Sequence, residues 1–164
     1  MSKARLVLTC GLPGAGKTTL AKEVATERCA VRLTKDEWQR ALGSSPWDLD
    51  TGEKIEGQLW RLAQEILTQG LSAVLDFGLW ARAERDELRV AARDLGNGVE
   101  LHYLDVPPEE LWRRIEARNS EPPWDDEPIG RADLDEWMTL FQAPDADELA
   151  LYDPPPAGGP DRRR

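Results

Sequence analysis

The chain has 164 residues and a formal net charge of −10, and 40% of its residues are hydrophobic. That length and composition suit a single globular domain in which helices cover a central sheet. The acidic balance argues against long nucleic acids and anionic membranes as partners, because both carry negative charge themselves. No apolar run reaches membrane-spanning length and the N-terminus lacks a signal-like apolar stretch, so we expect a cytoplasmic protein, with a monomer favoured.

The first elements are predicted to be a strand, a glycine-rich loop and a helix. Residues 5–10 are mostly apolar, as in a buried strand, and the residues from Leu20 to Ala25 have helical spacing. The segment between them fills every fixed position of the phosphate-loop pattern G-x-x-x-x-G-K-[ST]. It reads Gly11, Leu12, Pro13, Gly14, Ala15, Gly16, Lys17, Thr18, Thr19. We expect all of these residues to contact a nucleotide, since a strand, loop and helix in this order form a cradle for polyphosphate.

Each group that polyphosphate binding needs is present in this loop. The glycines let the chain approach the phosphates closely, and successive backbone N–H groups form an anion-binding nest. Lys17 is predicted to contact the β- and γ-phosphates and to act in their transfer, and the Thr18 hydroxyl is predicted to bind Mg²⁺. The alternative is a glycine-rich turn beside an ordinary surface lysine. A dinucleotide-binding loop is disfavoured because no glycine follows Gly16 at the third position of that fingerprint.

Strands and helices alternate along the rest of the chain. Further strands are predicted at 30–33, 72–76 and 99–104, and helices at 37–42, 50–70, 81–95, 107–118 and 134–141. Residues 149–152 suit either a short strand or a helix, and the Pro/Gly-rich tail at 154–164 is expected to be disordered. This alternation predicts one α/β domain over 1–153 with a parallel sheet, whose ligands bind at the carboxyl ends of the strands.

Two aspartates are expected at that edge of the sheet. Asp76 ends the third strand and suits the position that holds Mg²⁺ or its bound water; the alternative is a strand-end Asp that caps a turn. Asp36 follows the second strand in a predicted loop at 34–36, where its carboxylate can accept a proton from an attacking hydroxyl. The alternative for Asp36 is the N-cap of the next helix.

A Pro- and acid-rich segment at 120–130, which we expect to be mobile, is flanked by the candidate lid arginines Arg113, Arg114, Arg118 and Arg131. Arg114 and Arg118 share one face of their helix and are predicted to contact the triphosphate, with Arg118 acting in catalysis. The alternative is a solvated helix face. Four of the seven tryptophans lie near predicted loops and are candidates for stacking on a planar ligand, with packing as the default explanation. These are Trp38, Trp47, Trp80 and Trp124.

Together these features resemble the P-loop kinases of the polynucleotide-kinase and zeta-toxin-like group. The likeness is carried by the loop at 11–18 and by the segments 34–38, 74–82 and 118–148. It implies a P-loop NTPase three-layer sandwich with strand order 2-3-1-4, or 2-3-1-4-5 if a fifth strand forms. It also implies Asp36 as the base and a small helical lid near 113–131. Gln39 is a departure, because phage-type polynucleotide kinases carry an arginine there.

Three functions are weighed on this basis. The leading one is an ATP-dependent kinase that uses ATP and Mg²⁺ to phosphorylate a hydroxyl of a small or nucleotide-like acceptor. A polynucleotide 5′-kinase is weakened by the net charge and by Gln39. A nucleotide-binding switch or ATPase would have no acceptor at all. ATP is favoured over GTP because Glu37 occupies the position where a guanine-binding motif has Asp.

Overall fold

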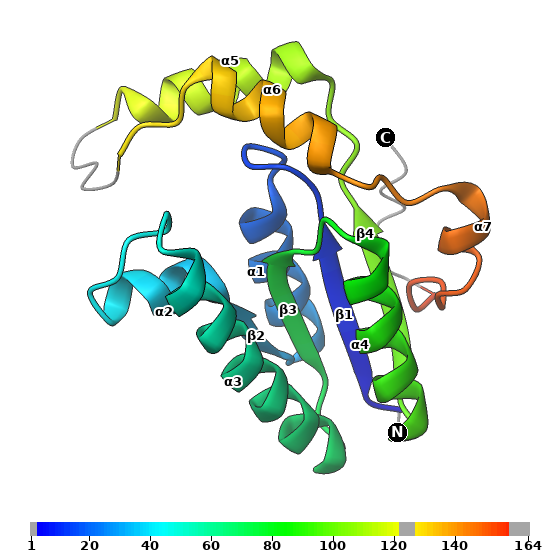
Figure 1. Cartoon of the computed structure of the whole chain (residues 1–164). Coiled ribbons are helices and arrows are strands. Elements are labelled where there is room, and N and C mark those ends of the chain that lie inside the picture. Colours follow the sequence, from blue (N-terminus) through cyan, green and yellow to red (C-terminus); the bar gives the residue numbers. More distant parts are fainter. Residues whose placement is uncertain (1–2, 122–126, 158–164) are drawn as a thin grey trace.

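The computed structural model describes residues 3–121 and 127–157. Its centre is a parallel sheet ordered β2-β3-β1-β4, with helices on both faces (Figure 1). This arrangement confirms the α/β class and the predicted order 2-3-1-4. The strands are β1 (Arg5–Cys10), β2 (Val31–Thr34), β3 (Ala73–Gly78) and β4 (Gly98–Tyr103).

Helices complete the outer layers and an arch above the sheet. One face of the sheet packs against α1 (Lys17–Arg28), and the other against α3 (Leu49–Thr68) and α4 (Arg82–Asp94). Figure 1 shows two further helices across the carboxyl ends of the strands, α5 (Pro108–Asn119) and α6 (Arg131–Leu140). These two helices form the arch. The short helices are α2 (Lys35–Ala41) and α7 (Ala146–Leu149). None of the helices in the described part of the chain is long and apolar enough to cross a membrane.

The central strand β1 is apolar on both faces because helices cover both of them. Leu6 and Leu8 point into the α3 and α4 layer, whereas Val7 packs with residues of α1. In the parallel register, Thr9 of β1 and Thr34 of β2 both pair with Asp76 of β3. Three strands therefore carry polar residues at one level near their carboxyl ends, close to the phosphate loop.

Several local predictions differ from the structure. For example, α6 begins at Arg131 and not at 134, and β3 continues past Asp76 to Gly78. Helix α2 begins at Lys35, so the predicted loop at 34–36 is absent. Helix α3 begins at Leu49, because the Asp48 carboxylate accepts a hydrogen bond from the Thr51 N–H and caps the helix two residues earlier than expected. The segment expected as a fifth strand or a helix forms α7 and a turn.

Among the described residues, the edge of β4 therefore carries no fifth strand. Asp153 contacts that edge at a single residue, Val99. Its backbone N–H donates to the Val99 carbonyl, and its carboxylate accepts from the Val99 N–H, both at 2.8 Å. One contact satisfies two backbone groups of the edge without a ladder of strand hydrogen bonds. The predicted tail at 154–164 lies partly outside the described residues, which end at 157.

Candidate nucleotide-binding site

The glycine-rich segment forms a tight loop between β1 and α1. Gly14 and Gly16 have φ of +85° and +95°, a left-handed conformation that L-residues with a side chain adopt only at a cost. A Cβ on Gly14 would lie 3.2 Å from both the Ile115 Cγ1 and the Leu111 carbonyl oxygen. The loop is thus packed closely against α5, and glycine at 14 is required by conformation and by space together.

Helix α1 offers its N-terminus to an anion. Its N-cap is Gly16, which has no side chain to satisfy the first N–H groups, and the first turn carries no acidic residue. The unpaired N–H groups and the helix dipole both favour negative charge at this point. This geometry suits a bound phosphate.

The Lys17 side chain lies inside the loop. Its Nζ donates to the Leu12 carbonyl at 3.0 Å. Burial lowers the pKa of the Lys17 ammonium, while the carboxylates of Asp76 and Asp36 act in the opposite direction and the Arg118 charge lowers the pKa further. The charges of Asp76, Asp36 and Arg118 therefore act on Lys17, although these residues are spread over a hundred residues of sequence.

Asp76 is the best-connected side chain of the site. It is only 5% exposed and accepts hydrogen bonds from three threonine hydroxyls. Thr18 Oγ1 lies 2.7 Å and Thr34 Oγ1 3.2 Å from Oδ2, and Thr9 Oγ1 lies 3.0 Å from Oδ1. Sequence reasoning missed Thr9 and Thr34. Their signal was a polar residue near the carboxyl end of an otherwise apolar strand, at the level where the phosphate loop begins.

The Thr18 hydroxyl and the Asp76 carboxylate suit Mg²⁺ in their chemistry. Both present hard oxygen donors, and Mg²⁺ is usually held by one or two protein oxygens together with water and phosphate oxygens. Within 3–121 and 127–157, no group of three or more His, Cys, Asp or Glu side chains could hold a metal by itself. A magnesium ion here would therefore depend on the phosphates for the rest of its ligands.

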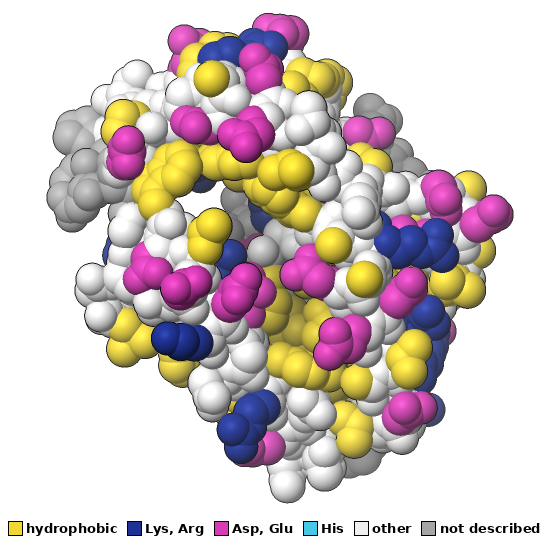
Figure 2. Space-filling model, viewed as in Figure 1, with side chains coloured by type: hydrophobic (Ala, Val, Ile, Leu, Met, Phe, Trp, Pro, Cys, Tyr) yellow, Lys and Arg dark blue, Asp and Glu magenta, His cyan; other side chains and the backbone are white. Residues whose placement is uncertain are grey.

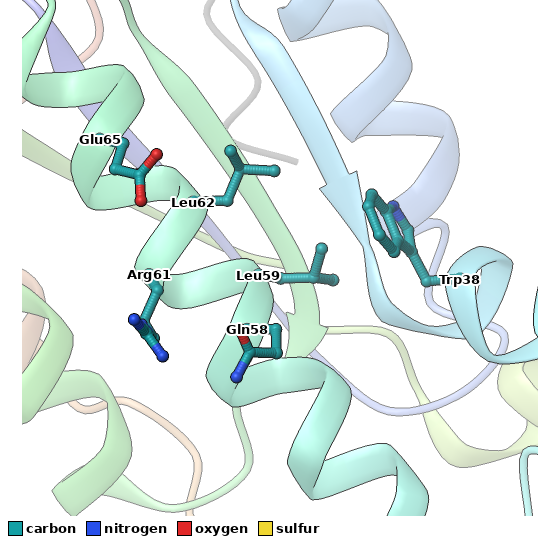
Figure 3. A pocket seen from close by; sticks show the side chains of 6 residues that line it. All are labelled: Trp38, Gln58, Leu59, Arg61, Leu62 and Glu65. Carbon is teal, nitrogen blue, oxygen red and sulfur yellow. The ribbon is translucent and has the colours of Figure 1, made fainter.

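Asp36 lies in the first turn of α2 and is exposed. Thr34 occupies the N-cap position, so the alternative role of Asp36 as N-cap is wrong. Trp38, two positions further along the helix, points to a different side. It lines a groove of about 260 Å³ between α2 and α3, in which Arg61 and Leu62 are among the lining residues (Figure 3). The structure thus places Trp38 on the groove between α2 and α3, on a different side of the helix from Asp36.

The predicted lid arginines fall into two groups. Arg114 Nη1 donates to the carbonyls of Gly14 and Ala15 at 3.2 and 3.4 Å, so it holds the phosphate loop from above. Arg118 lies close enough to influence the charge on Lys17. Arg113 and Arg131 instead form surface ion pairs, with nitrogen–oxygen distances of 2.7 and 2.8 Å to Glu110 and Glu109. The middle of the predicted mobile segment, 122–126, lies outside the described residues.

The match to known families agrees with this geometry. The family described as AAA domain matches residues 6–144, which is most of the chain. The chain belongs to this family. No curated protein matches the chain closely enough to serve as a relative.

Solved structures share the fold of this AAA-domain chain. A chain of the Pnkp1/Rnl/Hen1 RNA repair complex has a TM-score of 0.69 and 20% identity; the match covers 93% of this chain and 47% of that one. The present chain thus spans about half the length of that protein. A proposed kinase from Chloroflexus aurantiacus has a TM-score of 0.68 and 23% identity, with 97% and 86% covered. A gluconokinase from Sinorhizobium meliloti has a TM-score of 0.57 and 16% identity, and the match covers 88% of this chain and 78% of that one. These likenesses confirm a P-loop kinase type of fold.

In this AAA-domain chain, tryptophans from two connections meet a tryptophan of α6. Trp137 of α6 packs against Trp80 and Trp47, with ring centroids 5.9 and 5.7 Å apart. The Trp47 indole N–H donates to the Glu127 carbonyl at 3.3 Å, which ties the α2–α3 connection to the segment before α6. Figure 2 shows a band of hydrophobic side chains under α6, bordering a hollow. Trp124, the remaining candidate, lies outside the described residues.

Proposed function

We propose that this chain is an ATP-dependent phosphotransferase that moves the γ-phosphate to a hydroxyl of a small-molecule or nucleotide-like acceptor. The observation that carries the proposal is the phosphate loop itself, where the Lys17 ammonium lies against the Leu12 carbonyl and the Asp76 carboxylate accepts from the Thr18 hydroxyl at 2.7 Å. The charges of Asp36 and Arg118 act on the same lysine. A kinase needs two cations for the phosphates, one carboxylate for the metal and one for the attacking hydroxyl. The fold shared with kinases supports the same reaction class.

The nucleotide is bound chiefly by backbone groups. The β- and γ-phosphates occupy the N–H nest of residues 11–19, with the Lys17 ammonium beside them and Arg114 holding the loop in shape. The Thr18 and Asp76 oxygens would hold Mg²⁺, which neutralises charge on the phosphate oxygens when it is bound. Arg118 offers a further cation where negative charge grows during transfer.

The acceptor is placed in the hollow beside the loop, where Asp36 can take up its hydroxyl proton. The Asp36 carboxylate is exposed, so a bound acceptor can reach it and pass it a proton as the hydroxyl attacks. The tryptophans under α6 provide an apolar wall that can exclude water from the transfer, which favours acceptor phosphorylation over hydrolysis of ATP.

A polynucleotide 5′-kinase is the second candidate, supported by the fold likeness to the RNA repair chain. Two observations weigh against it. The net charge of −10 opposes long nucleic acids. Gln39, at the position of the expected arginine, is fully buried, and its Nε2 donates to the carbonyls of Ser45 and Asp48 at 2.9 Å each. It therefore supports the α2–α3 connection, and a phosphate contact from this position is disfavoured.

The test is a screen of hydroxyl acceptors with γ-labelled ATP, using the wild-type protein, Lys17→Ala and Asp36→Asn. Lys17→Ala should lose transfer entirely. Asp36→Asn should bind a fluorescent ATP analogue normally while transfer falls by about 10²–10⁴-fold, the usual contribution of a general base. Glu37→Gln is the matched control, since Glu37 lies on the same helix as Asp36 but pairs with Arg32 of β2.

Two results would overturn the proposal. Wild-type protein that hydrolyses ATP but labels none of a broad acceptor set would favour the switch or ATPase. Asp36→Asn protein that transfers at the normal rate would remove Asp36 from the reaction.

A further inference from the structure

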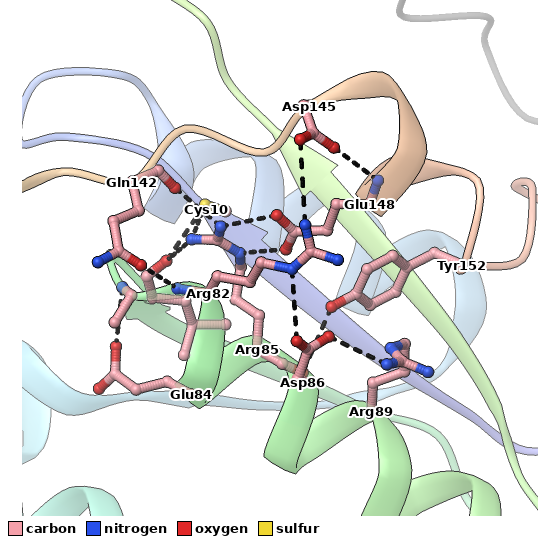
Figure 4. Close-up of polar contacts among 12 residues, drawn as sticks. Cys10, Arg82, Glu84, Arg85, Asp86, Arg89, Gln142, Asp145, Glu148 and Tyr152 are labelled. Atoms are coloured by element: carbon pink, nitrogen blue, oxygen red, sulfur yellow. Dashed lines mark hydrogen bonds and ion pairs between the residues drawn. The ribbon is translucent and has the colours of Figure 1, made fainter.

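A buried ion pair lies where the arch joins the sheet. Arg85, in the first turn of α4, has no exposed surface, and Glu148 of α7 is 1% exposed. The pair is bidentate, with Nε to Oε1 at 2.6 Å and Nη2 to Oε2 at 2.9 Å. Figure 4 shows the guanidinium at the centre of a polar cluster that also contains Cys10 and Gln142. Burying two charges is costly, so a complete set of partners is needed to keep them there.

The remaining guanidinium donors all contact backbone carbonyls. Nη1 donates to Leu79 at 2.8 Å and to Trp80 at 3.2 Å, and Nη2 donates to Gln142 at 2.8 Å. The Leu79 carbonyl also accepts from the thiol of Cys10, the residue immediately before the phosphate loop, at 3.3 Å. One side chain thus joins the turn after β3, the chain leaving α6 and the start of the loop.

The turn that Arg85 holds is strained. Leu79 has φ of +49°, a left-handed conformation that is uncommon for a residue with a side chain. This turn directs Trp80 over Gly78, where the indole Nε1 lies 3.3 Å from the position a Cβ would occupy. The Gln142 N–H donates in turn to the Trp80 carbonyl at 3.0 Å, so the end of α6 is attached to the same turn.

We propose that Arg85, locked by Glu148, is a positioning residue that sets the arch and Trp80 relative to the phosphate loop in the geometry that phosphoryl transfer requires. The inference rests on the proposed function but concerns residues that do not contact the nucleotide. Its physical basis is that transfer tolerates little misplacement of the groups around the phosphate, whereas ground-state binding to the loop tolerates more.

The competing explanation is that the pair only stabilises the fold. A double variant, Arg85→Met with Glu148→Leu, separates the two roles. Replacing both members of a buried pair by apolar residues of similar size is often neutral for stability, whereas removing one member leaves a buried charge. The double variant should therefore be more stable than Arg85→Met alone, and it lacks every hydrogen bond from residue 85 to the carbonyls of Leu79, Trp80 and Gln142.

Two measurements follow on this variant. With Mg²⁺ present, its affinity for ADP with aluminium fluoride, a mimic of the transferring phosphoryl group, should fall by about tenfold or more, whereas its affinity for a non-hydrolysable ATP analogue changes less than about threefold. Hydrogen exchange at the Gln142 amide should accelerate because its partner turn is released. Arg93→Met is the control: Arg93 lies on the same helix, in a partly exposed pair with Asp153.

Arg85→Lys extends the test if the double variant does not fold. Lysine keeps a charge for Glu148 but cannot supply the planar fork that reaches three carbonyls, so the same loss of mimic affinity is expected. The proposal would be overturned by a folded variant that loses no more affinity for the aluminium fluoride mimic than for the ATP analogue, and whose Gln142 amide exchanges at the wild-type rate. If wild-type protein binds neither nucleotide, the proposed function fails, and exchange at Gln142 still decides whether Arg85 positions the end of α6.

Discussion

The packing of α5 on the phosphate loop can be tested at a single glycine. Gly14→Ala places a methyl group 3.2 Å from the Ile115 side chain and from the Leu111 carbonyl, at a φ of +85°. Both costs act on the folded state. The carbonyl belongs to the backbone of α5, so the helix must shift or the loop must open.

The size of the effect follows from the two costs. A left-handed backbone costs a residue with a Cβ about 1–2 kcal/mol, and an extra methyl group in a tightly packed site costs about 1–3 kcal/mol. Gly14→Ala should therefore destabilise the protein by about 2–5 kcal/mol, the sum of those two ranges. In a protein of this size, each kcal/mol lowers the melting temperature by about 2–4 °C.

Two other glycines provide matched controls. Gly16 and Gly43 have φ of +95° and +75°, and a Cβ on either would meet no atom within 4 Å. Gly16→Ala and Gly43→Ala should thus cost only the backbone contribution, about 1–2 kcal/mol. Urea unfolding of all three variants measures the difference, and nucleotide titration should show weaker binding for the two loop variants but normal binding for Gly43→Ala.

The comparison has a clear refuting result. If Gly14→Ala and Gly16→Ala are equally destabilised, α5 does not press on the loop and the arch is not seated as described. Destabilisation of Gly43→Ala as large as that of Gly14→Ala would show instead that the backbone cost alone explains the effect.

Two further predictions concern charge. Arg118→Ala should lower the transfer rate by about 10²-fold or more while changing nucleotide affinity much less, because the charge that Arg118 meets is largest in the transition state. ATP and Mg²⁺ should protect residues 118–131 of the wild-type protein from limited proteolysis. Equal cleavage with and without nucleotide, together with an unchanged rate in the variant, would mean that Arg118 only lies on a solvated face. Burial raises the pKa of Glu100, but hydrogen bonds from His102, Arg28 and Arg5 outweigh it and hold that pKa below its ordinary value. The stability that this lowered pKa contributes is complete above the unfolded-state pKa of Glu100 and is lost as pH falls through the folded-state pKa. The free energies of unfolding of Glu100→Gln and wild type should therefore differ by about 1–3 kcal/mol at pH 7 and converge in acid. A difference that stays the same at every pH would contradict this.

The phosphate loop could be predicted from sequence because everything it needs is local. A strand, a nest of N–H groups and a helix N-terminus follow one another within residues 5–28, and the residue types alone specify their conformations. The place of Asp76 was also predictable, since a carboxylate near the end of an apolar strand lies at the carboxyl edge of a parallel sheet. In both cases a few adjacent residues carry the information.

Element boundaries were less predictable because competing caps lie close together. Asp48 and Asp50 are both good N-caps, and only the backbone path after α2 decides that Asp48 bonds the Thr51 N–H. Similarly, Thr34 ends β2 and starts α2 at once, so the expected loop before Asp36 has no residues left to form it.

Contacts between distant segments were decided only by the tertiary structure. Strand register brings Thr9 and Thr34 to Asp76, and no local pattern encodes register between strands forty or more residues apart. Arg113 and Arg114 are adjacent and chemically identical, yet the seating of α5 sends only Arg114 to the loop. The sequence by itself determined which chemistry the loop can perform, because that chemistry is built from neighbouring residues. The fold decided which distant side chains surround it, because their proximity depends on how whole helices pack.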